Sequence, residues 1–527
     1  MITGKNFIGE KASAKGAKTY RTYDPKKNNE TEWTFHEATK EEIDLALKKA
    51  TTAFKAYKGI PGTEKAKFLR AIAEEIEALG DPLIQAYVTE SGLPEGRAIG
   101  ERGRTMGQLR AFADLLEEGS WIEATIDTAQ PERKPLPKSD IRKMMEPLGP
   151  VAIFGASNFP FAFSTAGGDT ASALAAGCPV IVKSHPMHAG TGELVSLAVI
   201  RAAKRTGMPD GVFSNLNSSG IEVGQQLVMH PQIKGVGFTG SIKGGMALYK
   251  LANERPEPIP VFAEMGSINP VVALPSALEE KGDHWAAQYA GSITLGAGQF
   301  CTNPGLILGI KGKPLDNFVA KLGQDIIQIA PSAMLHPNIH KGYEQGKKEL
   351  SSQGETAIVA SYDGDSPSNY GKQKVLTVSG TDFLKNSVLH REVFGPFSLV
   401  VQCKDERELE NVLLHLDGQL TGTILGNAEE LRQYGIIVDA LKSRVGRIIF
   451  NGVPTGVEVC PSMQHGGPFP ASTDSRFTSV GVSAIKRWVR PVSYQDWPQE
   501  LLPEALKNNN PLNIMRLVNG TYTDKKI

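Results

Sequence analysis

Short apolar runs alternate with helix-like segments from about residue 150 onward, and this alternation constrains the fold more than any other feature of the sequence. The runs "VAIFG", "PVIVKS", "GVFSNL" and "KGVGFTGS" are separated by segments such as "TASALAAG" and a second one near residues 190 to 206. Another alternating region runs from "PVFAEMG" to about residue 480. Strands that alternate with helices form parallel sheets with helices on both faces. We therefore expect an α/β fold.

Three segments between residues 40 and 120 have the periodicity of amphipathic helices: "KEEIDLALKKATTAFKAY", "EKAKFLRAIAEEIEALG" and "RTMGQLRAFADLLEEG". Their apolar residues recur at intervals of three and four, so each segment has one face for a core. The stretch that follows, "RKPLPKSDIRKMMEPLGP", is charged and rich in proline, which favours an extended excursion or a hairpin. We expect a boundary between larger units there.

Charge and cysteine content limit the kind of partner. The chain of 527 residues carries 57 Lys and Arg against 57 Asp and Glu, so no net charge draws it to nucleic acid or to an anionic membrane. The four cysteines are far apart and form no CxxC or Cys/His cluster, which argues against disulfides and against a metal site. The first 20 residues lack the apolar core of a signal peptide. We expect a soluble, cytoplasmic protein of two or three domains that acts on a small molecule.

One strand-to-helix junction has the composition of a phosphate-binding turn. The sequence contains neither GxGxxG nor GxxxxGK[ST], the two common glycine-rich fingerprints. In "GVGFTGSIKGG", however, a probable strand runs into Thr239, Gly240 and Ser241 and then into a helix. Backbone N–H groups and a hydroxyl at a helix start hold a pyrophosphate well. Junctions of this composition are also common without a ligand, so the motif alone leaves both readings open.

The stretch "GAGQFCTN" places Cys301 in a glycine-rich, nearly uncharged loop. Most isolated cysteines are small buried hydrophobes, and these usually lie inside a strand or a helix. A reactive thiol instead needs a loop in which small neighbours let another molecule approach. Cys301 is therefore a candidate nucleophile, with core packing as the alternative.

Six short motifs occur in a fixed order: "SNFPF", "VIVKSHP", "GFTGS", "FAEMGSINP", "GQFC" and "REVFGP". Together they resemble the aldehyde dehydrogenase superfamily, over about residues 25 to 490. The variants "NFPFAFSTAGGDTASALAAGCP" and "QHGGPFPASTD", with "SHP" after Lys183, are similar to the branch that contains α-ketoglutaric semialdehyde dehydrogenases and a bacterial NADP-dependent fatty-aldehyde dehydrogenase.

The resemblance implies an aldehyde dehydrogenase-like arrangement of domains. A Rossmann-type, dinucleotide-binding domain is expected over residues 1–125 and 149–260, and an α/β catalytic domain over 261–485. Residues 126–148 and 486–527 are expected to form a small oligomerisation element, as part of a homodimer or homotetramer.

The resemblance also assigns three catalytic residues. Cys301 is expected to attack the aldehyde, because a thiolate is the best side-chain nucleophile for a reversible adduct. The amide of Asn158 and the Cys301 N–H are expected to hold the oxyanion. Glu264 is expected to activate the water that hydrolyses the thioester, with its pKa raised toward neutrality by an apolar site. Without the family context, Asn158 is equally well a turn residue and Glu264 a salt-bridged carboxylate. Ser267 departs from a glycine pair that is common in the family, which questions the geometry of its loop.

The cofactor residues come from the same resemblance. Lys183 is expected to bind the adenosine ribose, Ser241 the pyrophosphate and Glu392 the nicotinamide ribose. The full expected set is Lys183, Ser184, His185, Thr239, Gly240, Ser241, Glu392 and Phe394. Relatives that prefer NAD commonly carry a glutamate where this chain has Pro186, and that carboxylate repels a 2′-phosphate. We therefore expect NADP or NAD as cofactor, with NADP favoured.

For the substrate, the branch resemblance implies oxidation of α-ketoglutaric semialdehyde to 2-oxoglutarate. Arg104 and Gln108 would share a helical face that binds the substrate carboxylate, next to Phe159 and to a tunnel lined by "STAGGDT". Arg110 is instead expected to be solvated, or paired with Glu101, Glu117 or Glu118. The alternatives are a medium- or long-chain fatty aldehyde as substrate, or a catalytically silent binding or structural protein on this fold. A CoA-acylating enzyme would be expected to lack Glu264.

Overall fold

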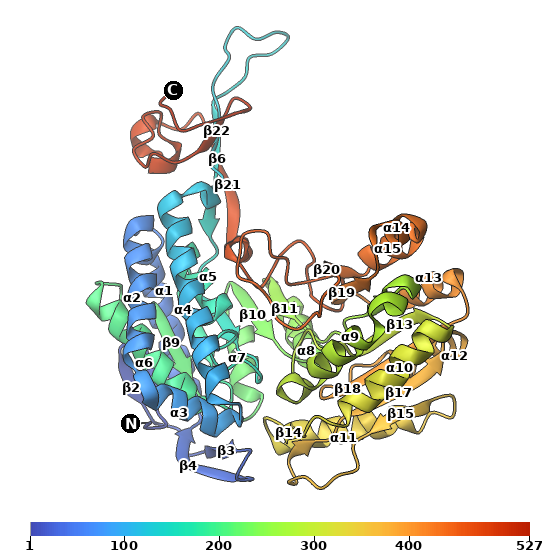
Figure 1. Ribbon diagram of the computed structural model, residues 1–527. Helices are drawn as coiled ribbons and strands as arrows, with labels where there is room; N and C mark the ends of the chain where they lie inside the picture. Colours follow the sequence, from blue (N-terminus) through green and yellow to red (C-terminus); the bar gives the residue numbers. More distant parts are fainter. Residues whose placement is uncertain (1) are drawn as a thin grey trace.

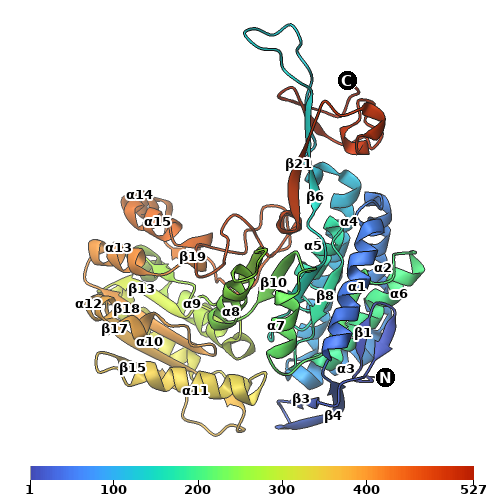
Figure 2. The ribbon, with the colours of Figure 1, turned by 180° about the vertical axis from the view of Figure 1, so that it is seen from behind.

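The computed structural model describes residues 2–527 and has two α/β bodies and an arm that projects from them (Figures 1 and 2). In this part of the chain, the strands form two seven-stranded sheets, one five-stranded sheet and two small two-stranded sheets. Most strands of the two large sheets are parallel to their neighbours. The α/β fold predicted from the alternation is therefore confirmed.

The first sheet has the strand order β11-β10-β7-β8-β9-β1-β2, of which β11 to β9 are parallel. Its side chains alternate between two cores. Val151 and Ile153 pack on one face, and Ala152 and Phe154 pack on the other, because successive residues of a strand point to opposite sides. The strands are β1 (Asn6–Ile8), β2 (Lys11–Ser13), β7 (Val151–Phe154), β8 (Val180–Lys183), β9 (Phe213–Leu216), β10 (Gly235–Thr239) and β11 (Val261–Glu264).

Helices cover both faces of this sheet. The helices on the face of Val151 are α2 (Gly62–Ala78), α3 (Gly80–Ser91), α4 (Glu95–Glu118), α5 (Gly168–Ala176) and α6 (Ala189–Arg205). The helices on the opposite face are α1 (Lys40–Tyr57), α7 (Glu222–Met229) and α8 (Ile242–Asn253). A capping box formed by Thr39 and Glu42 starts α1.

Two features of the helical region differ from the sequence prediction. Helix α3 was not predicted: it follows α2 at once, because Gly80 turns the chain with a φ of 54°. Helix α4 begins at Glu95, well before the predicted segment that starts at Arg104. Its first turns carry Gly96, Gly100 and Gly103, which weaken the apolar periodicity that the prediction relied on.

The second sheet has the order β15-β17-β18-β13-β12-β19-β20, parallel except for β15. Its strands are β12 (Val271–Ala273), β13 (Leu306–Ile310), β15 (Ala357–Ser361), β17 (Lys374–Ser379), β18 (Phe397–Cys403), β19 (Gln419–Leu425) and β20 (Val445–Phe450). Helices α9 (Pro275–Thr294) and α10 (Lys313–Ile326) pack on one face. The other core takes side chains from α11 (Pro337–Ser351), α12 (Gly380–Lys385), α13 (Glu406–His415), α14 (Ala428–Gln433) and α15 (Gly435–Lys442).

The arm is a five-stranded sheet of order β21-β6-β5-β22-β23. It stands away from both large sheets, at the top of Figures 1 and 2. Its strands are β5 (Thr125–Asp127), β6 (Ile141–Pro147), β21 (Val489–Gln495), β22 (Arg516–Val518) and β23 (Thr521–Thr523). The small sheets pair β3 (Thr19–Asp24) with β4 (Asn29–His36), and β14 (Ser332–Ala333) with β16 (Tyr370–Gly371). The division into domains, and the oligomerising role of the arm, stay predictions.

The helices also bear on membrane insertion. Across residues 2–527, none combines the length and the apolar character that a membrane crossing requires.

A buried ion pair fastens the base of the arm to the first sheet. Arg487 donates to Asp169 of α5 over 2.7 Å, and the Trp488 indole donates to Ser172 of the same helix over 2.7 Å. The side chains of Arg487 and Asp169 are 4% and 9% exposed. Asp169 therefore pairs with Arg487 and packs α5, whereas the prediction for the other polar residues of "STAGGDT" stays a prediction.

Replacing Arg487 with Met should destabilise the protein strongly, because it leaves the Asp169 carboxylate buried without its partner. Removing one member of a buried pair costs about 3–5 kcal/mol. The urea midpoint followed by circular dichroism should fall accordingly. Arg476→Met removes an exposed pair with Asp474 and should leave the midpoint unchanged. Equal midpoints for the two variants would contradict the structural role of Arg487.

Candidate active site

A cavity of about 390 Å³ opens where the ends of β7, β10 and β11 face the second body. Eight of the residues predicted from the sequence lie on its wall: Asn158, Thr239, Gly240, Ser241, Glu264, Cys301, Glu392 and Phe394. The sequence analysis did not identify the other lining residues, which are Ala156, Ser157, Met265, Gly266, Ile339, Gly342 and Tyr343. Parallel strands that end at one edge thus bring together segments that are far apart in the chain.

The loop that carries Cys301 has an unusual backbone. Gly296, Ala297 and Gly298 all have positive φ, between 55° and 65°. At Gly298 a side chain has no room, because a Cβ atom there would lie 2.2 Å from the backbone of Gly395. The loop is thereby held against the segment after Glu392, and the half-buried sulfur of Cys301 faces the cavity.

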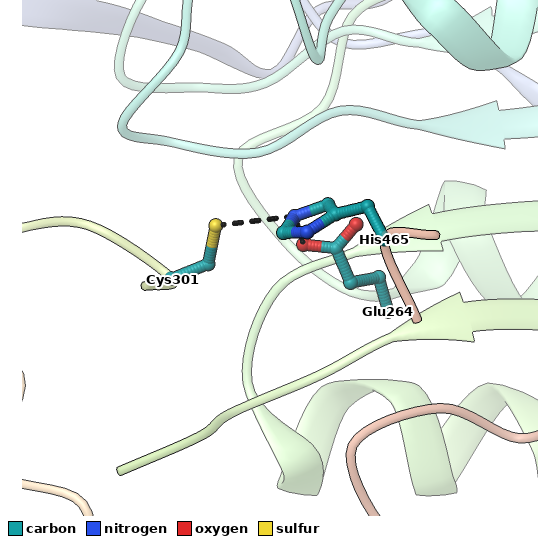
Figure 3. Close-up of side chains that lie close together, drawn as sticks. All are labelled: Glu264, Cys301 and His465. Atoms are coloured by element: carbon teal, nitrogen blue, oxygen red, sulfur yellow. Dashed lines mark hydrogen bonds and ion pairs between the residues drawn. The ribbon is translucent and has the colours of Figure 1, made fainter. Parts of the chain in front are cut away.

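His465 lies beside this sulfur, and the sequence analysis did not identify it (Figure 3). Its Nε2 atom lies 3.5 Å from Cys301 Sγ and 2.9 Å from Glu264 Oε1, and the ring is fully buried. The only sequence signal was its position in "QHGGPFPASTD", which was used as a branch motif and not as a source of a catalytic side chain. His465 joins the predicted nucleophile and the predicted base into one cluster.

The charges in this cluster differ from the sequence prediction. Burial by itself raises the pKa of Glu264, but the contacts with His465 and a hydrogen bond from Ser479 outweigh it and lower the pKa below its ordinary value. The expectation that the pKa of Glu264 is raised toward neutrality is therefore wrong. The pKa of Cys301 is raised well above its ordinary value, by burial and then by the charge of Glu264, while Arg104 opposes that shift. At neutral pH the pair is a carboxylate beside a thiol.

Asn158 is fixed from two sides. Its side-chain Nδ2 donates to the backbone carbonyl of Gln299 over 3.0 Å, and its backbone carbonyl accepts from Arg97 over 2.7 Å. The Arg97 guanidinium lies between the rings of Phe159 and Phe300, 4.8 and 4.6 Å from their centroids. An amide has a second N–H, so the Asn158 side chain retains a donor for a ligand.

The predicted cofactor residues lie at the ends of neighbouring strands. Lys183 ends β8, and burial lowers its pKa to about 8. Among residues 2–527, the buried Ser184 hydroxyl has no hydrogen-bond partner. The His185 ring stacks on His188, with the ring centroids 5.0 Å apart. Its Nδ1 atom accepts a hydrogen bond from the Met187 N–H, two residues along the same turn. These residues lie outside the cavity wall described above.

The remaining cofactor candidates surround the start of a helix. Ser241 is the N-cap of α8 and accepts from the Gly244 N–H over 3.2 Å. Glu392 faces Gly266 closely, since a Cβ atom at Gly266 would lie 2.4 Å from its carboxylate. Burial raises the pKa of Glu392 to about 7. A free hydroxyl at Ser184, a helix start and a buried acceptor fit the ribose hydroxyls and the pyrophosphate of a dinucleotide.

Arg104 and Gln108 lie on the inner face of α4, as their spacing predicts. The Arg104 guanidinium stacks on Phe163 at 5.2 Å. Within the described part of the chain, its Nε and Nη2 atoms and the Gln108 amide nitrogen are buried without an acceptor. Arg110, by contrast, is exposed and lies 3.4 Å from Glu77, which was not among its expected partners.

Phe159 belongs to an apolar cluster beside the cysteine loop. Its ring meets Phe163 and Phe300 edge-on, at 5.3 and 5.4 Å. The cluster comprises Ala156, Phe159, Ala162, Phe163, Phe300 and Val480. Arg104 stacks on this cluster, so an apolar surface and a cation lie side by side.

Ser267, the residue that departs from the family pattern, stabilises its loop. Its hydroxyl lies 2.9 Å from Gln419 Oε1 and 2.9 Å from Asn269 Oδ1, and it accepts from the Leu420 N–H over 3.0 Å. Asn269 Nδ2 then donates to the carbonyl of Cys301 over 2.9 Å. The serine thus connects the second sheet to the cysteine loop.

Known proteins agree with this architecture. Residues 12–468 match the aldehyde dehydrogenase family. The chain is 48% identical to alpha-ketoglutaric semialdehyde dehydrogenase 2 of Azospirillum brasilense and 46% identical to an alpha-ketoglutaric semialdehyde dehydrogenase of Acinetobacter baylyi, each over 521 residues and 99% of both chains. The resemblance to that branch is therefore confirmed.

Solved structures with low identity share the fold. A 1-pyrroline-5-carboxylate dehydrogenase has a TM-score of 0.79 at 21% identity, covering 94% of this chain and 92% of its own. A methylmalonate-semialdehyde dehydrogenase from Oceanimonas doudoroffii has a TM-score of 0.80 at 18% identity, covering 94% and 99%. The ordered motifs, the family match and the full-length relatives lead to one conclusion: the chain belongs to the aldehyde dehydrogenase family.

Proposed function

We propose that the protein oxidises α-ketoglutaric semialdehyde (2,5-dioxopentanoate) to 2-oxoglutarate with NAD(P). The observation that carries this proposal is the buried guanidinium of Arg104, which lacks an acceptor at Nε and Nη2 among residues 2–527. A substrate carboxylate supplies that acceptor, and arginine binds carboxylates through two parallel hydrogen bonds. The names of the two full-length relatives support the same substrate.

His465 prepares the nucleophile. The high pKa of Cys301 means that its thiol must lose a proton before attack, and the nearest base is Nε2 of His465, at 3.5 Å. Sγ then forms a bond to the aldehyde carbon, while the proton moves to the imidazole. The Glu264 carboxylate, 2.9 Å from Nε2, stabilises the imidazolium. The second N–H of the Asn158 amide donates to the oxyanion of the thiohemiacetal.

A bound nicotinamide nucleotide supplies the acceptor for the hydride that leaves the adduct. Lys183 and the Ser184 hydroxyl would hold its adenosine ribose, and the start of α8 at Ser241 would hold its pyrophosphate. Glu392 would accept from the hydroxyls of its nicotinamide ribose, and Phe394 would contact the nicotinamide. The thioester that remains on Cys301 is hydrolysed by a water whose proton Glu264 accepts. Its Oε1 atom contacts His465 Nε2 at 2.9 Å and accepts no other hydrogen bond from residues 2–527, so a water molecule can still donate to it.

A medium- or long-chain fatty aldehyde is the second candidate substrate. The apolar cluster that contains Phe159, Phe163 and Phe300 favours an alkyl chain. Such a chain would leave the guanidinium of Arg104 desolvated and unpaired, which is costly. The semialdehyde is therefore the better substrate. A silent protein has no use for a buried cluster of thiol, imidazole and carboxylate, and CoA acylation does not need Glu264.

NADP should be preferred over NAD. Pro186 stands where a carboxylate would repel a 2′-phosphate, and Lys183 and Ser184 contribute a cation and a free donor nearby. The negative charge of Glu37 opposes this preference, because it repels a 2′-phosphate and is close enough to Lys183 to raise its pKa. The Glu37 carboxylate, however, already accepts from Ser219 and pairs with Lys18 at 3.1 Å.

The protein should also form a homodimer or homotetramer. Strand β20 ends the second sheet, and within residues 2–527 no strand pairs with its outer edge. Ile448 and Phe450 on this strand are 46% and 49% exposed. An open strand edge can pair with another chain, and exposed apolar side chains mark interaction surfaces. A homo-oligomer that covers β20 removes this edge from solvent.

Glu264→Gln should separate the two half-reactions. The variant should release close to one reduced cofactor per site in a burst and then turn over slowly, because acylation precedes the water step. Stopped-flow absorbance should record the burst, and mass spectrometry should find the acyl group on Cys301. Cys301→Ala should show neither burst nor turnover but should bind the cofactor normally, and Cys460→Ser should behave like the wild type. A wild-type steady state in Glu264→Gln would exclude this role of Glu264.

Arg104→Ala should raise KM for α-ketoglutaric semialdehyde by about 10- to 100-fold, the loss of a charge-assisted hydrogen bond of about 1.5–3 kcal/mol. The KM for hexanal should change little, because an alkanal has no carboxylate. Arg110→Ala, on the exposed face of the same helix, is the matched control and should match the wild type on both substrates. Equal losses on both substrates would make Arg104 structural. A wild-type enzyme that prefers long alkanals would refute the substrate.

Measured as kcat/KM, NADP should be at least as good as NAD in the wild type. Pro186→Glu should shift this ratio toward NAD, because the new carboxylate accepts from a 2′-hydroxyl and repels a 2′-phosphate. A wild-type ratio of ten or more in favour of NAD would contradict the proposed preference, without bearing on the aldehyde chemistry.

A further inference from the structure

The cluster in Figure 3 contains the three kinds of donor that zinc binds most often. Glu264, Cys301 and His465 contribute a carboxylate oxygen, a sulfur and an imidazole nitrogen, all within 4.8 Å of one another. We propose that these residues bind Zn²⁺ reversibly and that the bound ion withdraws the sulfur from catalysis. The proposal rests on the donor geometry and does not require the aldehyde substrate to be identified.

The spacing of the donors suits a tetrahedral ion. Zinc binds sulfur at about 2.3 Å, and imidazole nitrogen and carboxylate oxygen at about 2.0–2.2 Å. At tetrahedral angles these bonds place sulfur and nitrogen about 3.5 Å apart, and nitrogen and oxygen about 3.3 Å apart. The observed separations are 3.5 Å for Sγ to Nε2 and 2.9 Å for Nε2 to Oε1. The third pair, Sγ and the Glu264 oxygen, lies within 4.8 Å, against about 3.6 Å around a tetrahedral ion, so the Glu264 carboxylate moves toward the sulfur on binding.

The charges of the donors also suit a divalent cation. A thiolate and a carboxylate together carry two negative charges, which Zn²⁺ neutralises while the imidazole stays neutral. In the described part of the chain, Oε1 of the buried Glu264 has His465 Nε2 as its close polar neighbour, at 2.9 Å, whereas Ser479 donates to Oε2 and orients the group. An outer hydrogen bond of this kind fixes a ligating carboxylate. On binding, a bond forms between Sγ and zinc, and the thiol proton is released to solvent.

The cavity provides access and the fourth ligand. Cys301 and Glu264 both lie on the wall of the 390 Å³ space, so an ion and a water molecule can enter from that side. Three protein ligands and one open position are typical of zinc sites that exchange. A sulfur that donates an electron pair to zinc is a weaker nucleophile, and the ion with its water occupies the space beside it, so the enzyme is inactive until a chelator removes the ion.

Zinc binding can be measured directly on the purified enzyme by competition with a chromophoric chelator. The wild type should bind one Zn²⁺ per chain, and Cys301→Ser, His465→Ala and Glu264→Gln should each weaken binding, the first by at least 100-fold. Cys460→Ser is the matched control, because this half-buried thiol lies outside the cluster, 3.7 Å from the Ser462 hydroxyl. Co²⁺ in place of Zn²⁺ should give a sulfur-to-cobalt charge-transfer band that Cys301→Ser abolishes. Unchanged affinity in Cys301→Ser would overturn the proposal.

Alkylation of the wild type avoids the question of whether a variant folds. Zn²⁺ should protect Cys301 from iodoacetamide, as measured by peptide mass spectrometry, while Cys460 in the same sample reacts at an unchanged rate. EDTA should restore alkylation of Cys301. Equal alkylation of Cys301 with and without Zn²⁺ would refute the site, even if the enzyme proves to be a semialdehyde dehydrogenase. Protection in an enzyme without that activity would leave the metal site standing and the proposed function refuted.

Discussion

The contact between His465 and Glu264 determines how the rest of the site is built. Both side chains are buried, and isolating a carboxylate from water is costly unless a partner compensates it. The loop that carries His465 is therefore held firmly to β11, where Glu264 lies. Met265 donates to the carbonyl of Ala471, and Glu264 forms an antiparallel bridge with Ser472. Ser479, on the returning part of the same loop, bonds both the Glu264 carboxylate and the carbonyl of His465.

This arrangement links the cysteine to both large sheets. From the second sheet, the order of contacts runs from Gln419 through Ser267 and Asn269 to the carbonyl of Cys301. From the first, Asn158 contacts Gln299, two residues before the sulfur. A nucleophile that must meet a base and an oxyanion donor at once needs such support, because small displacements of these groups lower the rate steeply. The loop with three positive φ angles is the part of the backbone that makes these contacts compatible.

The sequence predicts well whatever depends on periodicity or on parallel strands. The fold and the meeting of Asn158, Ser241 and Glu264 at one cavity follow from alternation, since the carboxyl ends of parallel strands coincide. His465 could not be found this way, because it lies about 200 residues from Glu264 in the chain, in a loop over residues 451–481 that contains no helix or strand. The pKa of Glu264 was predicted in the wrong direction for the same reason: its sign depends on a partner that spacing does not reveal. Helix α4 was predicted too short because glycines on its outer face hide the apolar repeat.

In the proposed function, Arg104 connects substrate recognition to the reactivity of the thiol. Its positive charge favours the thiolate form of Cys301, and it also interacts with Glu101 and Glu264. A substrate carboxylate that pairs with Arg104 neutralises part of that charge and thereby withdraws support from the thiolate. The substrate anion and the nucleophile thus compete for one cation. A nearby base that takes the thiol proton resolves this competition, since the proton then remains within the cluster as an imidazolium facing Glu264. If Arg104 binds the substrate carboxylate as proposed, His465, which periodicity could not reveal, is the residue that lets an anionic aldehyde bind beside the sulfur.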